Sequence, residues 1–245
     1  MTDKLGVQSY CYRGIKDLPG LIAAVKATGV DRIELCGVHA DFSKREQHAE
    51  VIETLHKGGI RIVSIGVNGI GHDEATIRPS FDFLKAAGAK NMSISFDINA
   101  QPNCFRLAEK LAEEYDVRLG IHNHGGYDWL GSQTALAWVF KQTSQRIGLS
   151  LDTAWAMQTG RDVLGYVEQF GERLVLVHIK DFTFDRAGRW QDVVAGTGNL
   201  DLGKLKAALD KVGFTGELVI EYEGDVSNPV PALQACVQAI RSQMK

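Results

Sequence analysis

Short β-rich runs and longer helix-like segments alternate eight times along this chain, and no other feature limits its fold as strongly. The 245 residues divide into units of about 31, the size of a parallel strand followed by a crossover helix. Several of the β-rich runs are almost continuously apolar, as strands covered on both faces are. The expected strands are Leu5–Cys11, Arg32–Cys36, Ile60–Val67, Asn91–Phe96, Val117–His124, Ile147–Asp152, Leu174–Ile179 and Leu218–Tyr222.

Helical periodicity fills the intervals between these strands, with apolar residues at three- and four-residue spacing. Asp17, Asp73 and Ser132 are predicted to cap helix N-termini with their side-chain oxygens. Glycine follows four of the periodic stretches, where it is expected to end a helix in the left-handed conformation. These glycines are Gly29, Gly58, Gly88 and Gly213. The expected helices are Leu18–Thr28, Arg45–Lys57, Glu74–Ala87, Cys104–Tyr115, Gln133–Thr143, Val163–Phe170, Leu202–Lys211 and Pro231–Met244.

Eight strand–helix units of this size predict an α/β fold, a closed (β/α)₈ TIM barrel. Right-handed crossovers lay parallel strands side by side in order, and eight strands close the sheet. An open doubly wound sheet is the alternative. Because no Pro- or Ser-rich linker or low-complexity tract interrupts the chain, we expect residues 1–245 to form a single domain.

The composition excludes several classes of function. With 27 Lys and Arg against 30 Asp and Glu, the net charge is −3, so no basic surplus offers a surface to nucleic acid. No leader-like segment opens the sequence, and no stretch approaches the ~18 apolar residues of a membrane span. The four cysteines form no C-x-x-C pair, which fits a reducing compartment. We expect a cytoplasmic protein without nucleic-acid or membrane partners.

A barrel presents its catalytic groups at the carboxyl ends of its strands and in the loops that follow them. Applied to the expected strands, this rule selects a set of polar residues that includes four of the seven histidines. The selected residues are Glu34, Asn68, His72, Asp97, Asn99, His122, Asn123, His124, Asp152, His178, Lys180, Asp181, Glu221 and Glu223.

The fifth strand is expected to end in His122-Asn123-His124. The two-residue period of a strand places both histidines on one face and Asn123 on the other. Two imidazoles at a barrel mouth suit a metal or an acid–base site. The alternative is that one of them is a hydrogen-bonded core histidine.

Three further strands each end in a polar residue that a barrel interior otherwise excludes, namely Asp152, His178 and Glu221. A single divalent cation explains all of them together. Two carboxylates with one or two imidazoles form a mixed set that Mn²⁺, Zn²⁺ or Co²⁺ accepts, and the absence of paired thiolates argues against a structural zinc. The pattern leaves open whether His122 or His124 completes the set.

Two other motifs have a structural and a functional interpretation. Loops after strands seven and eight of a barrel often bind phosphate or sugar through backbone N–H groups, so the loop 196–201 either binds substrate or only caps the next helix. Its Gly-Thr-Gly lies outside a strand–helix turn, which excludes a dinucleotide site. Trp155 and other aromatic residues near the mouth form either a sugar platform or loop packing.

In combination and order, six segments of the chain resemble the xylose isomerase-like barrel superfamily. This superfamily contains sugar isomerases and epimerases, inosose dehydratases, hydroxypyruvate isomerases and apurinic endonucleases. The resemblance covers essentially the whole chain and is to a branch with a His-Asn-His triplet on strand five. The segments are Ile33-Glu34-Leu35, His122-Asn123-His124-Gly125, Leu151-Asp152-Thr153-Ala154-Trp155, His178-Ile179-Lys180-Asp181, Gly196–Asp201 and Ile220-Glu221.

Carried over position by position, the resemblance implies one catalytic divalent metal held by His122, Asp152, His178 and Glu221. Manganese is the expected ion, with zinc, cobalt and magnesium as alternatives. The catalytic residues that we expect are Glu221, His124, Glu34 and Lys180. The substrate-binding residues that we expect are Asn123, Trp155, His72, Asp181 and Glu223.

The resemblance implies an enzyme that isomerises or epimerises a small sugar or keto-sugar through an enediolate. Glu221 is expected to remove a proton next to the carbonyl, and His124, Glu34 or Lys180 to relay or return it.

Many epimerases of this type carry Glu at the position of His122, so a mechanism with two paired glutamates is not expected here. The alternative is β-elimination by a dehydratase or keto-glycoside lyase. Trp155 stands where the endonucleases carry a further metal ligand, which disfavours DNA repair. A sugar-binding barrel without catalysis is a third interpretation, and association into a homo-oligomer is one source of further contacts to substrate.

Overall fold

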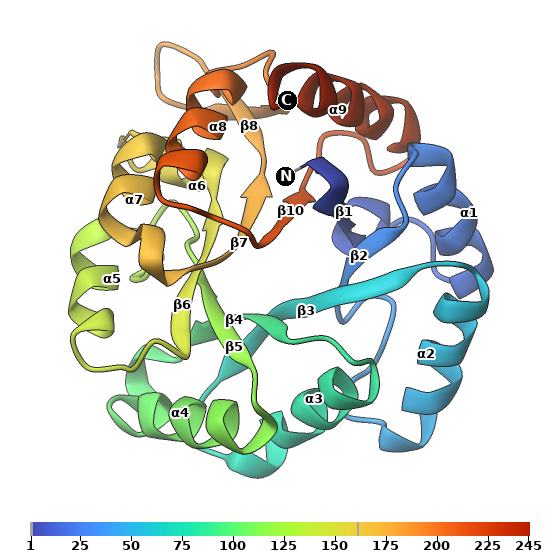
Figure 1. Cartoon of the computed structure of the whole chain (residues 1–245), viewed down its shortest axis with the longest axis vertical. Helices are drawn as coiled ribbons and strands as arrows, with labels where there is room; N and C mark the ends of the chain where they lie inside the picture. Colours follow the sequence, from blue (N-terminus) through green and yellow to red (C-terminus); the bar gives the residue numbers. More distant parts are fainter. Residues whose placement is uncertain (1, 161) are drawn as a thin grey trace.

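Eight parallel strands form a closed barrel in this computed structural model, which describes residues 2–160 and 162–245 (Figure 1). Going round the barrel, the order is β1-β10-β7-β6-β5-β4-β3-β2. The predicted (β/α)₈ barrel is therefore confirmed. The strands are β1 Leu5–Gln8, β2 Arg32–Leu35, β3 Arg61–Ile70, β4 Asn91–Phe96, β5 Arg118–His122, β6 Ile147–Asp152, β7 Leu174–Ile179 and β10 Glu217–Ile220.

Pairing of the first strand with the last closes the sheet. Leu5 of β1 lies opposite Leu218 of β10, and Val7 opposite Ile220. Closure leaves the barrel strands without the free edge that an open sheet exposes. Because all eight strands are parallel, their carboxyl ends meet at one mouth.

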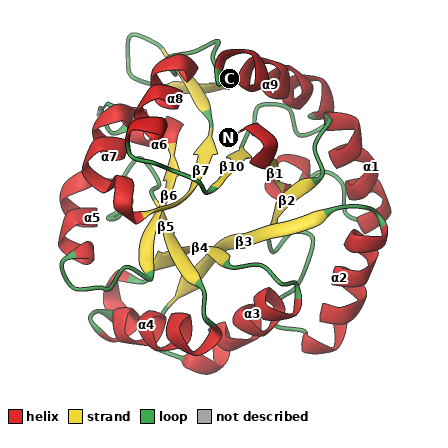
Figure 2. Cartoon of the chain, in the orientation of Figure 1, coloured by secondary structure: helices red, strands yellow, loops and turns green. Residues whose placement is uncertain are grey.

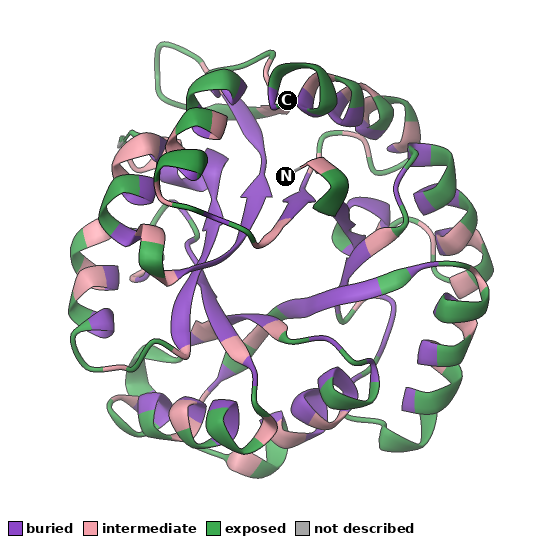
Figure 3. Cartoon of the chain, in the orientation of Figure 1, coloured by how far each residue is buried: buried purple, intermediate pink, exposed green. Residues whose placement is uncertain are grey.

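The α-helices form a ring outside the strands (Figure 2). Their outer faces are exposed, while the strands and inner helix faces are buried (Figure 3). The α-helices are α1 Leu18–Thr28, α2 His48–Lys57, α3 Glu74–Ala86, α4 Asn103–Tyr115, α5 Gln133–Phe140, α6 Thr153–Gln158, α7 Val163–Phe170, α8 Leu202–Lys211 and α9 Val230–Gln243. The 3₁₀ helices are η1 Thr2–Lys4, η2 Ser9–Tyr12, η3 Arg45–Gln47, η4 Ile98–Ala100 and η5 Gly171–Arg173.

Local sequence sets the helix boundaries. The side chains of Asp17, Asp73 and Ser132 accept backbone N–H groups at the starts of α1, α3 and α5, as predicted. Gly29 ends α1 with φ of 90°, also as predicted. Gly58 is the exception, because it keeps helical angles and its neighbour Gly59 takes the positive φ.

The structure adds elements that the eightfold pattern does not contain. An antiparallel hairpin, β8 Asp181–Phe184 and β9 Trp190–Val193, follows β7, and the short helix α6 follows β6. Four-residue strands paired across a turn carry too little periodicity to be recognised beside the barrel strands. Over the described part of the chain, no helix is long and apolar enough to cross a membrane.

Candidate metal centre and active site

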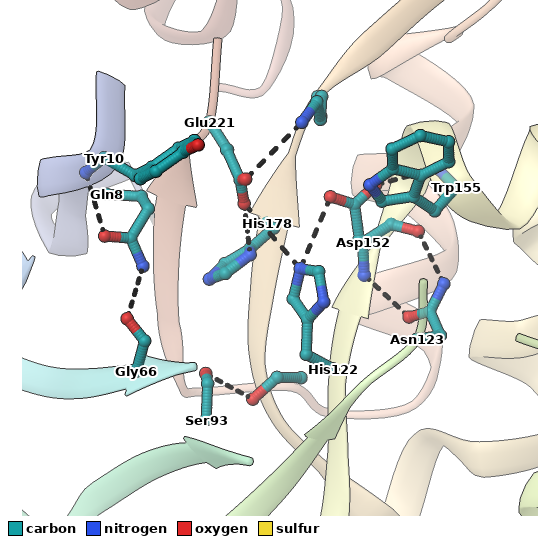
Figure 4. Close-up of polar contacts among 12 residues, drawn as sticks. Gln8, Tyr10, Gly66, Ser93, His122, Asn123, Asp152, Trp155, His178 and Glu221 are labelled. Atoms are coloured by element: carbon teal, nitrogen blue, oxygen red, sulfur yellow. Dashed lines mark hydrogen bonds and ion pairs between the residues drawn. The ribbon is translucent and has the colours of Figure 1, made fainter. Parts of the chain in front are cut away.

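Four buried side chains converge at the carboxyl end of neighbouring barrel strands. His122 ends β5, Asp152 ends β6, His178 lies in β7 and Glu221 directly follows β10. One ligand atom from each residue lies within 4.8 Å of the others (Figure 4). The side chains that the sequence predicted as metal ligands are thus brought together by four strands.

The strand register sets the common height of the four residues. Asp152 of β6 pairs with His178 of β7. His178 in turn pairs with Val219 of β10, two residues before Glu221. The backbone N–H of Glu221 donates to the carbonyl of Ile179 at 3.1 Å, which continues the β10–β7 ladder to the site.

Two ligand atoms in this cluster, His122 Nε2 and Asp152 Oδ2, are buried without a hydrogen-bond partner, and a third, His178 Nδ1, faces the carboxylate oxygen Glu221 Oε2 at 2.7 Å. His122 Nε2 lies 3.6 Å from Asp152 Oδ2 and 3.7 Å from Glu221 Oε2. Buried polar atoms in native proteins nearly always have partners. Two imidazole nitrogens and a carboxylate oxygen facing one point are the donor set of a divalent metal, so these residues fit such an ion.

The His178 ring is held between two carboxylates. Its Nε2 contacts Glu34 Oε2, and its Nδ1 lies 2.7 Å from Glu221 Oε2. Burial alone lowers the pKa of His178, but Glu34 and Glu221 outweigh burial and raise this pKa to about 10. Ser64 Oγ donates to Glu34 Oε1 at 2.9 Å and fixes the carboxylate. A carboxylate behind a ligating histidine orients the ring and strengthens it as a ligand.

Asp152 has two different oxygens. Oδ1 accepts the backbone N–H of Trp155 at 2.8 Å and caps helix α6, while Oδ2 faces His122. The side chain of Asn123 pairs with the backbone of Asp152 in both directions, with Nδ2 donating to its carbonyl at 3.0 Å and Oδ1 accepting its N–H at 2.8 Å. Asn123 therefore holds the end of β6 in place, and the prediction that it binds substrate does not fit its position.

Lys180 is buried among carboxylates beside the cluster. Its Nζ contacts Glu223, and lies 3.4 Å from Glu221 Oε1 and 3.8 Å from Asp192 Oδ2. Burial lowers the pKa of Lys180, but Glu221, Asp152 and Glu223 raise it above its ordinary value. An ammonium group held in this way keeps its proton, which does not suit the predicted proton relay.

A cavity of about 540 Å³ opens above the cluster. Its titratable wall follows β5 and the later strands and consists of His122, His124, Asp128, Glu221 and Glu223. Its other wall follows β1 to β4 and consists of the uncharged side chains Gln8, Tyr10, Cys36, Val38, Val67 and Ser95, with the backbone of Gly37 and Gly66.

His124 lines this cavity from a loop, because β5 ends at His122 and not at His124 as predicted. The two imidazole rings are still only 6.1 Å apart. Trp155 lies behind His124, with ring centroids 4.2 Å apart, and is not among the residues that line the cavity. Of the two interpretations of Trp155, the packing against His124 agrees with the loop-packing one.

Two other predicted site residues lie away from the cavity lining. Glu34 is fully buried beneath His178 instead of along the pocket wall. His72 is exposed in the loop after β3 and is not part of the lining. The strand-end rule selects both because it gives height along the barrel axis but not the direction of the side chain.

The Asp181 carboxylate fills the glycine-containing loop after the hairpin. Its Oδ2 accepts the N–H groups of Gly196 and Gly198 at 2.9 and 2.8 Å, and its Oδ1 accepts those of Asn199 and Leu200 at 2.9 Å each. These are the N–H groups that the sequence analysis considered for phosphate or sugar. Because a side chain of the protein occupies them, Asp181 organises the loop and does not face substrate.

The uncharged wall of the cavity does not follow from the sequence pattern. Gln8 and Tyr10 fall inside the expected strand Leu5–Cys11, but β1 ends at Gln8 and η2 follows, which turns Tyr10 into the mouth. Asp128 lies in the loop after β5, six residues beyond the strand end. No signal in the sequence distinguishes these positions from ordinary strand and loop residues.

Comparison with protein families gives a match to the model described as xylose isomerase-like TIM barrel, over residues 95–243. Among curated proteins, the chain is 30% identical over 143 residues to the rhizopine catabolism protein MocC of Rhizobium meliloti, covering 53% of this chain and 43% of that protein. It is 24% identical over 206 residues to the inosose dehydratase of Geobacillus thermodenitrificans, covering 76% and 66%. The matches thus span less than two thirds of either relative.

Solved structures share the whole fold. The probable 3-DHS dehydratase AsbF of Bacillus anthracis aligns with a TM-score of 0.76 at 13% identity, covering 97% of this chain and 98% of that one. The 3-keto-D-glucoside 4-epimerase YcjR of E. coli aligns at 0.72 and 15%, covering 98% and 99%. A xylose isomerase-like TIM barrel protein of Mycobacterium smegmatis in complex with magnesium aligns at 0.71 and 17%, covering 92% and 89%.

Proposed function

The chain belongs to the xylose isomerase-like TIM barrel family, and from this premise we propose that it is a metal-dependent isomerase or epimerase of a small sugar or keto-sugar. The observation that carries the proposal is the buried group of His122, Asp152, His178 and Glu221, in which His122 Nε2 and Asp152 Oδ2 have no hydrogen-bond partner. The narrower assignment to the His-Asn-His branch rests on the sequence alone and stays a prediction.

In this proposal the metal ligands are His122, Asp152, His178 and Glu221. A divalent cation held there polarises a substrate carbonyl and its neighbouring hydroxyl and stabilises the negative charge that develops on them. Mn²⁺ suits two imidazoles with two carboxylates, and Zn²⁺, Co²⁺ and Mg²⁺ are the alternatives. The magnesium in the Mycobacterium smegmatis barrel belongs to a protein of the same fold.

Glu221 is the proposed proton acceptor. It reaches the cavity, and despite its burial the charge of Lys180 and the two imidazoles hold its pKa well below the ordinary value. The carboxylate is therefore ionised at neutral pH. His124 is the proposed partner that returns the proton, because it is the other imidazole in the lining and Trp155 fixes its ring.

The two remaining residues with a predicted catalytic role act on this pair from outside the cavity lining. Glu34 orients His178, and Lys180 keeps Glu221 ionised. Both are positioning residues in the proposal, since neither is among the residues that line the cavity.

Elimination is the second candidate. The same proton abstraction expels a leaving group on the next carbon when an acid stands near it. His122 stands where many epimerases carry their second glutamate, so the acid in this candidate is the imidazole of His124, which can protonate a leaving oxygen as well as a carbon. The names of two relatives, an inosose dehydratase and a probable 3-DHS dehydratase, agree with this candidate.

The test combines metal analysis with product analysis. The protein is stripped with a chelator, reloaded with Mn²⁺, Zn²⁺, Co²⁺ or Mg²⁺, and assayed on ketoses and 3-keto-sugars in D₂O. We expect turnover only in the reloaded protein, with deuterium at the carbon next to the carbonyl in an isomerised or epimerised product. Release of water with an unsaturated product supports the dehydratase instead. Full activity in the stripped protein contradicts both candidates.

We also propose that the protein works in the cytoplasm. Its four cysteines are all free and buried, a state that a reducing compartment preserves. Fractionation of cells that express the chain tests this part, and a periplasmic or secreted product contradicts it.

A further inference from the structure

The cavity above the four candidate metal ligands is lined by negative and neutral side chains, whereas a pocket that binds an anion is lined by positive ones. Among the described residues, its lining contains no Lys and no Arg but three carboxylates, Asp128, Glu221 and Glu223. A phosphorylated or acidic substrate is ordinarily held by cationic side chains or by free backbone N–H groups. Near this cavity, the cationic side chains of Lys180 and Arg13 and the N–H groups of the loop 196–200 are already bound to acceptors of the protein.

Two cations that contact residues of the cavity lining, Lys180 and Arg13, are bound to protein acceptors. Lys180 is surrounded by Glu221, Glu223 and Asp192, and its side chain is 1% exposed. Arg13 donates to the carbonyls of Tyr10 and Glu223, at 3.3 and 2.9 Å, and its guanidinium lies over the Tyr10 ring.

The backbone donors of the loop 196–200 that face Asp181 are bound as well. Barrels often hold phosphate with the loops that follow their seventh and eighth strands. Here four backbone N–H groups of the loop 196–200 donate to the Asp181 carboxylate, at 2.8 to 2.9 Å. A phosphate cannot enter without displacing a carboxylate that is itself buried.

A bound divalent metal ion would not make the cavity positively charged. Its two charges are matched by the carboxylates of Asp152 and Glu221, two of its own candidate ligands. Glu223 is paired with Lys180, so that among the charged side chains that line the cavity Asp128 remains as an additional negative charge. The opposite wall, with Gln8, Tyr10 and Ser95, offers neutral hydrogen-bonding groups of the kind that bind hydroxyls.

We infer that this site selects an uncharged polyhydroxylated ketone, a free keto-sugar or ketocyclitol, and rejects its phosphate esters and acidic analogues. The inference rests on the proposed function for the reacting end of the substrate. It adds that Asp128 and the filled loop 196–200 exclude a negative charge at the distal end.

Binding to the metal-loaded wild-type protein tests the selection without requiring turnover. The probes are D-ribulose against D-ribulose 5-phosphate and D-fructose against D-fructose 6-phosphate, whose phosphates lie far from the carbonyl. We expect the neutral member to bind at least about tenfold more tightly, with a ratio that shrinks as salt screens the mouth. A phosphate ester that binds as tightly as its neutral partner overturns the inference. Binding of the neutral sugar without turnover contradicts the proposed function instead and leaves the charge selection standing.

A second experiment reverses the charge of Asp128 at the mouth of the cavity. Asp128→Lys should raise the affinity for the phosphate esters by about tenfold or more relative to that for the free sugars, with both affinities measured in the same variant. Glu46→Lys makes the same change of net charge at an exposed position outside the cavity lining, and it should alter neither. If the two variants gain equally in affinity for the phosphate esters, the effect comes from net charge alone and contradicts the proposed selection at the cavity mouth.

Discussion

Two buried aspartates on neighbouring segments of the barrel mouth have opposite environments. Asp181, just after β7, accepts four backbone N–H groups, two on each oxygen. Asp152, at the end of β6, accepts one N–H on Oδ1 and leaves Oδ2 buried without a partner. The same side chain is therefore structural where its bonds are complete, and a candidate ligand where one oxygen is free.

The groups around the two aspartates differ in the same way, in whether their hydrogen bonds are complete. Every donor in loop 196–200 that faces Asp181 has found its acceptor, so nothing is left for an external group. Around Asp152, the unpartnered His122 Nε2 and the ligand atoms of His178 and Glu221 all lie within 4.8 Å of one another. Because burying a polar atom without a partner costs about 1–3 kcal/mol, such a concentration is retained where a ligand completes the set.

Removing the free oxygen of Asp152 should have the largest effect. Asp152→Asn keeps an oxygen to cap α6 but puts an amide where the metal-facing oxygen lies. We expect at least about a 100-fold loss of metal affinity, with activity falling in step. Metal content after dialysis and kcat/KM measure the two effects.

Asp162→Asn is the matched control, because Asp162 also caps a helix, α7, and lies outside the cavity lining. It should retain metal and activity. A metal-loaded, fully active Asp152→Asn protein would remove Asp152 from the proposed site.

Replacing Asp181 should lower the free energy of unfolding and leave the metal content unchanged. Asp181→Ala leaves four loop N–H groups without their acceptor, and we expect a loss of about 3 kcal/mol in the free energy of unfolding. Millimolar phosphate should restore part of this loss by occupying the emptied loop and should not stabilise the wild type. Denaturant unfolding with and without phosphate measures both.

Asp201→Ala serves as the comparison at the end of the same loop, since Asp201 caps α8 and pairs with Lys204 from an exposed position. Its loss should be smaller and insensitive to phosphate. An Asp181→Ala protein as stable as the wild type would show that the loop does not depend on this carboxylate.

The carboxylate behind His178 should appear in the pH dependence of metal binding. Because Glu34 and Glu221 overcome the effect of burial and raise the pKa of His178 to about 10, the metal-free protein carries a proton there that the metal must displace. Apparent metal affinity should therefore rise with pH from about 6 to 9, by up to about tenfold per unit for one proton. Glu34→Gln removes one cause of the raised pKa and should flatten this slope.

Calorimetric titrations in buffers of different ionisation enthalpy count the protons released. Glu217→Gln changes a carboxylate that pairs with Arg32 away from the site and should keep the wild-type slope. The role given to Glu34 is wrong if both variants release as many protons as the wild type.

Asp192 should give the smallest effect, on stability alone. Burial raises its pKa to about 7 against the attraction of Lys180. The folded protein thus holds a proton up to a pH near 7, whereas an unfolded Asp releases it near 4. Asp192 therefore costs stability increasingly as the pH rises from about 4 to 7. Asp192→Asn should stabilise the protein by about 1 kcal/mol above pH 7 and leave it unchanged near pH 4.

Thermal unfolding at several pH values checks this prediction. Asp185→Asn, an exposed position in the same hairpin segment, should show no gain that grows with pH. A gain of equal size at low and high pH would assign the effect to something other than the buried charge.

Much of this site follows from the sequence because a parallel barrel brings its strand ends together. His122, Asp152, His178 and Glu221 each stand at the end of an apolar run, and closure of the sheet places them within 4.8 Å. Asp152 and His178 are at the predicted strand positions, and the boundaries of β4, β6 and β7 match the expected ones.

The errors share one cause. Glu34, Asn123 and Asp181 stand at the expected height, but their side chains point to His178, to the backbone of Asp152 and to the loop 196–200. Position along a strand fixes the height of a side chain in the barrel but not the group that it contacts. Hydrogen-bond partners from distant segments then decide whether that side chain supports the site or enters it.

The sequence by itself determined the barrel and the identity of the polar residues at its mouth, since both depend on periodicity and on position along each strand. Only the tertiary structure decided which of these residues have a complete set of bonds and which do not. Asp181 and Asp152 look equivalent in the chain, and the N–H groups that satisfy the first lie 15 to 19 residues away. Because hydrogen bonds between distant segments form only when the fold is complete, the difference between a structural carboxylate and a candidate ligand is a property of the folded molecule.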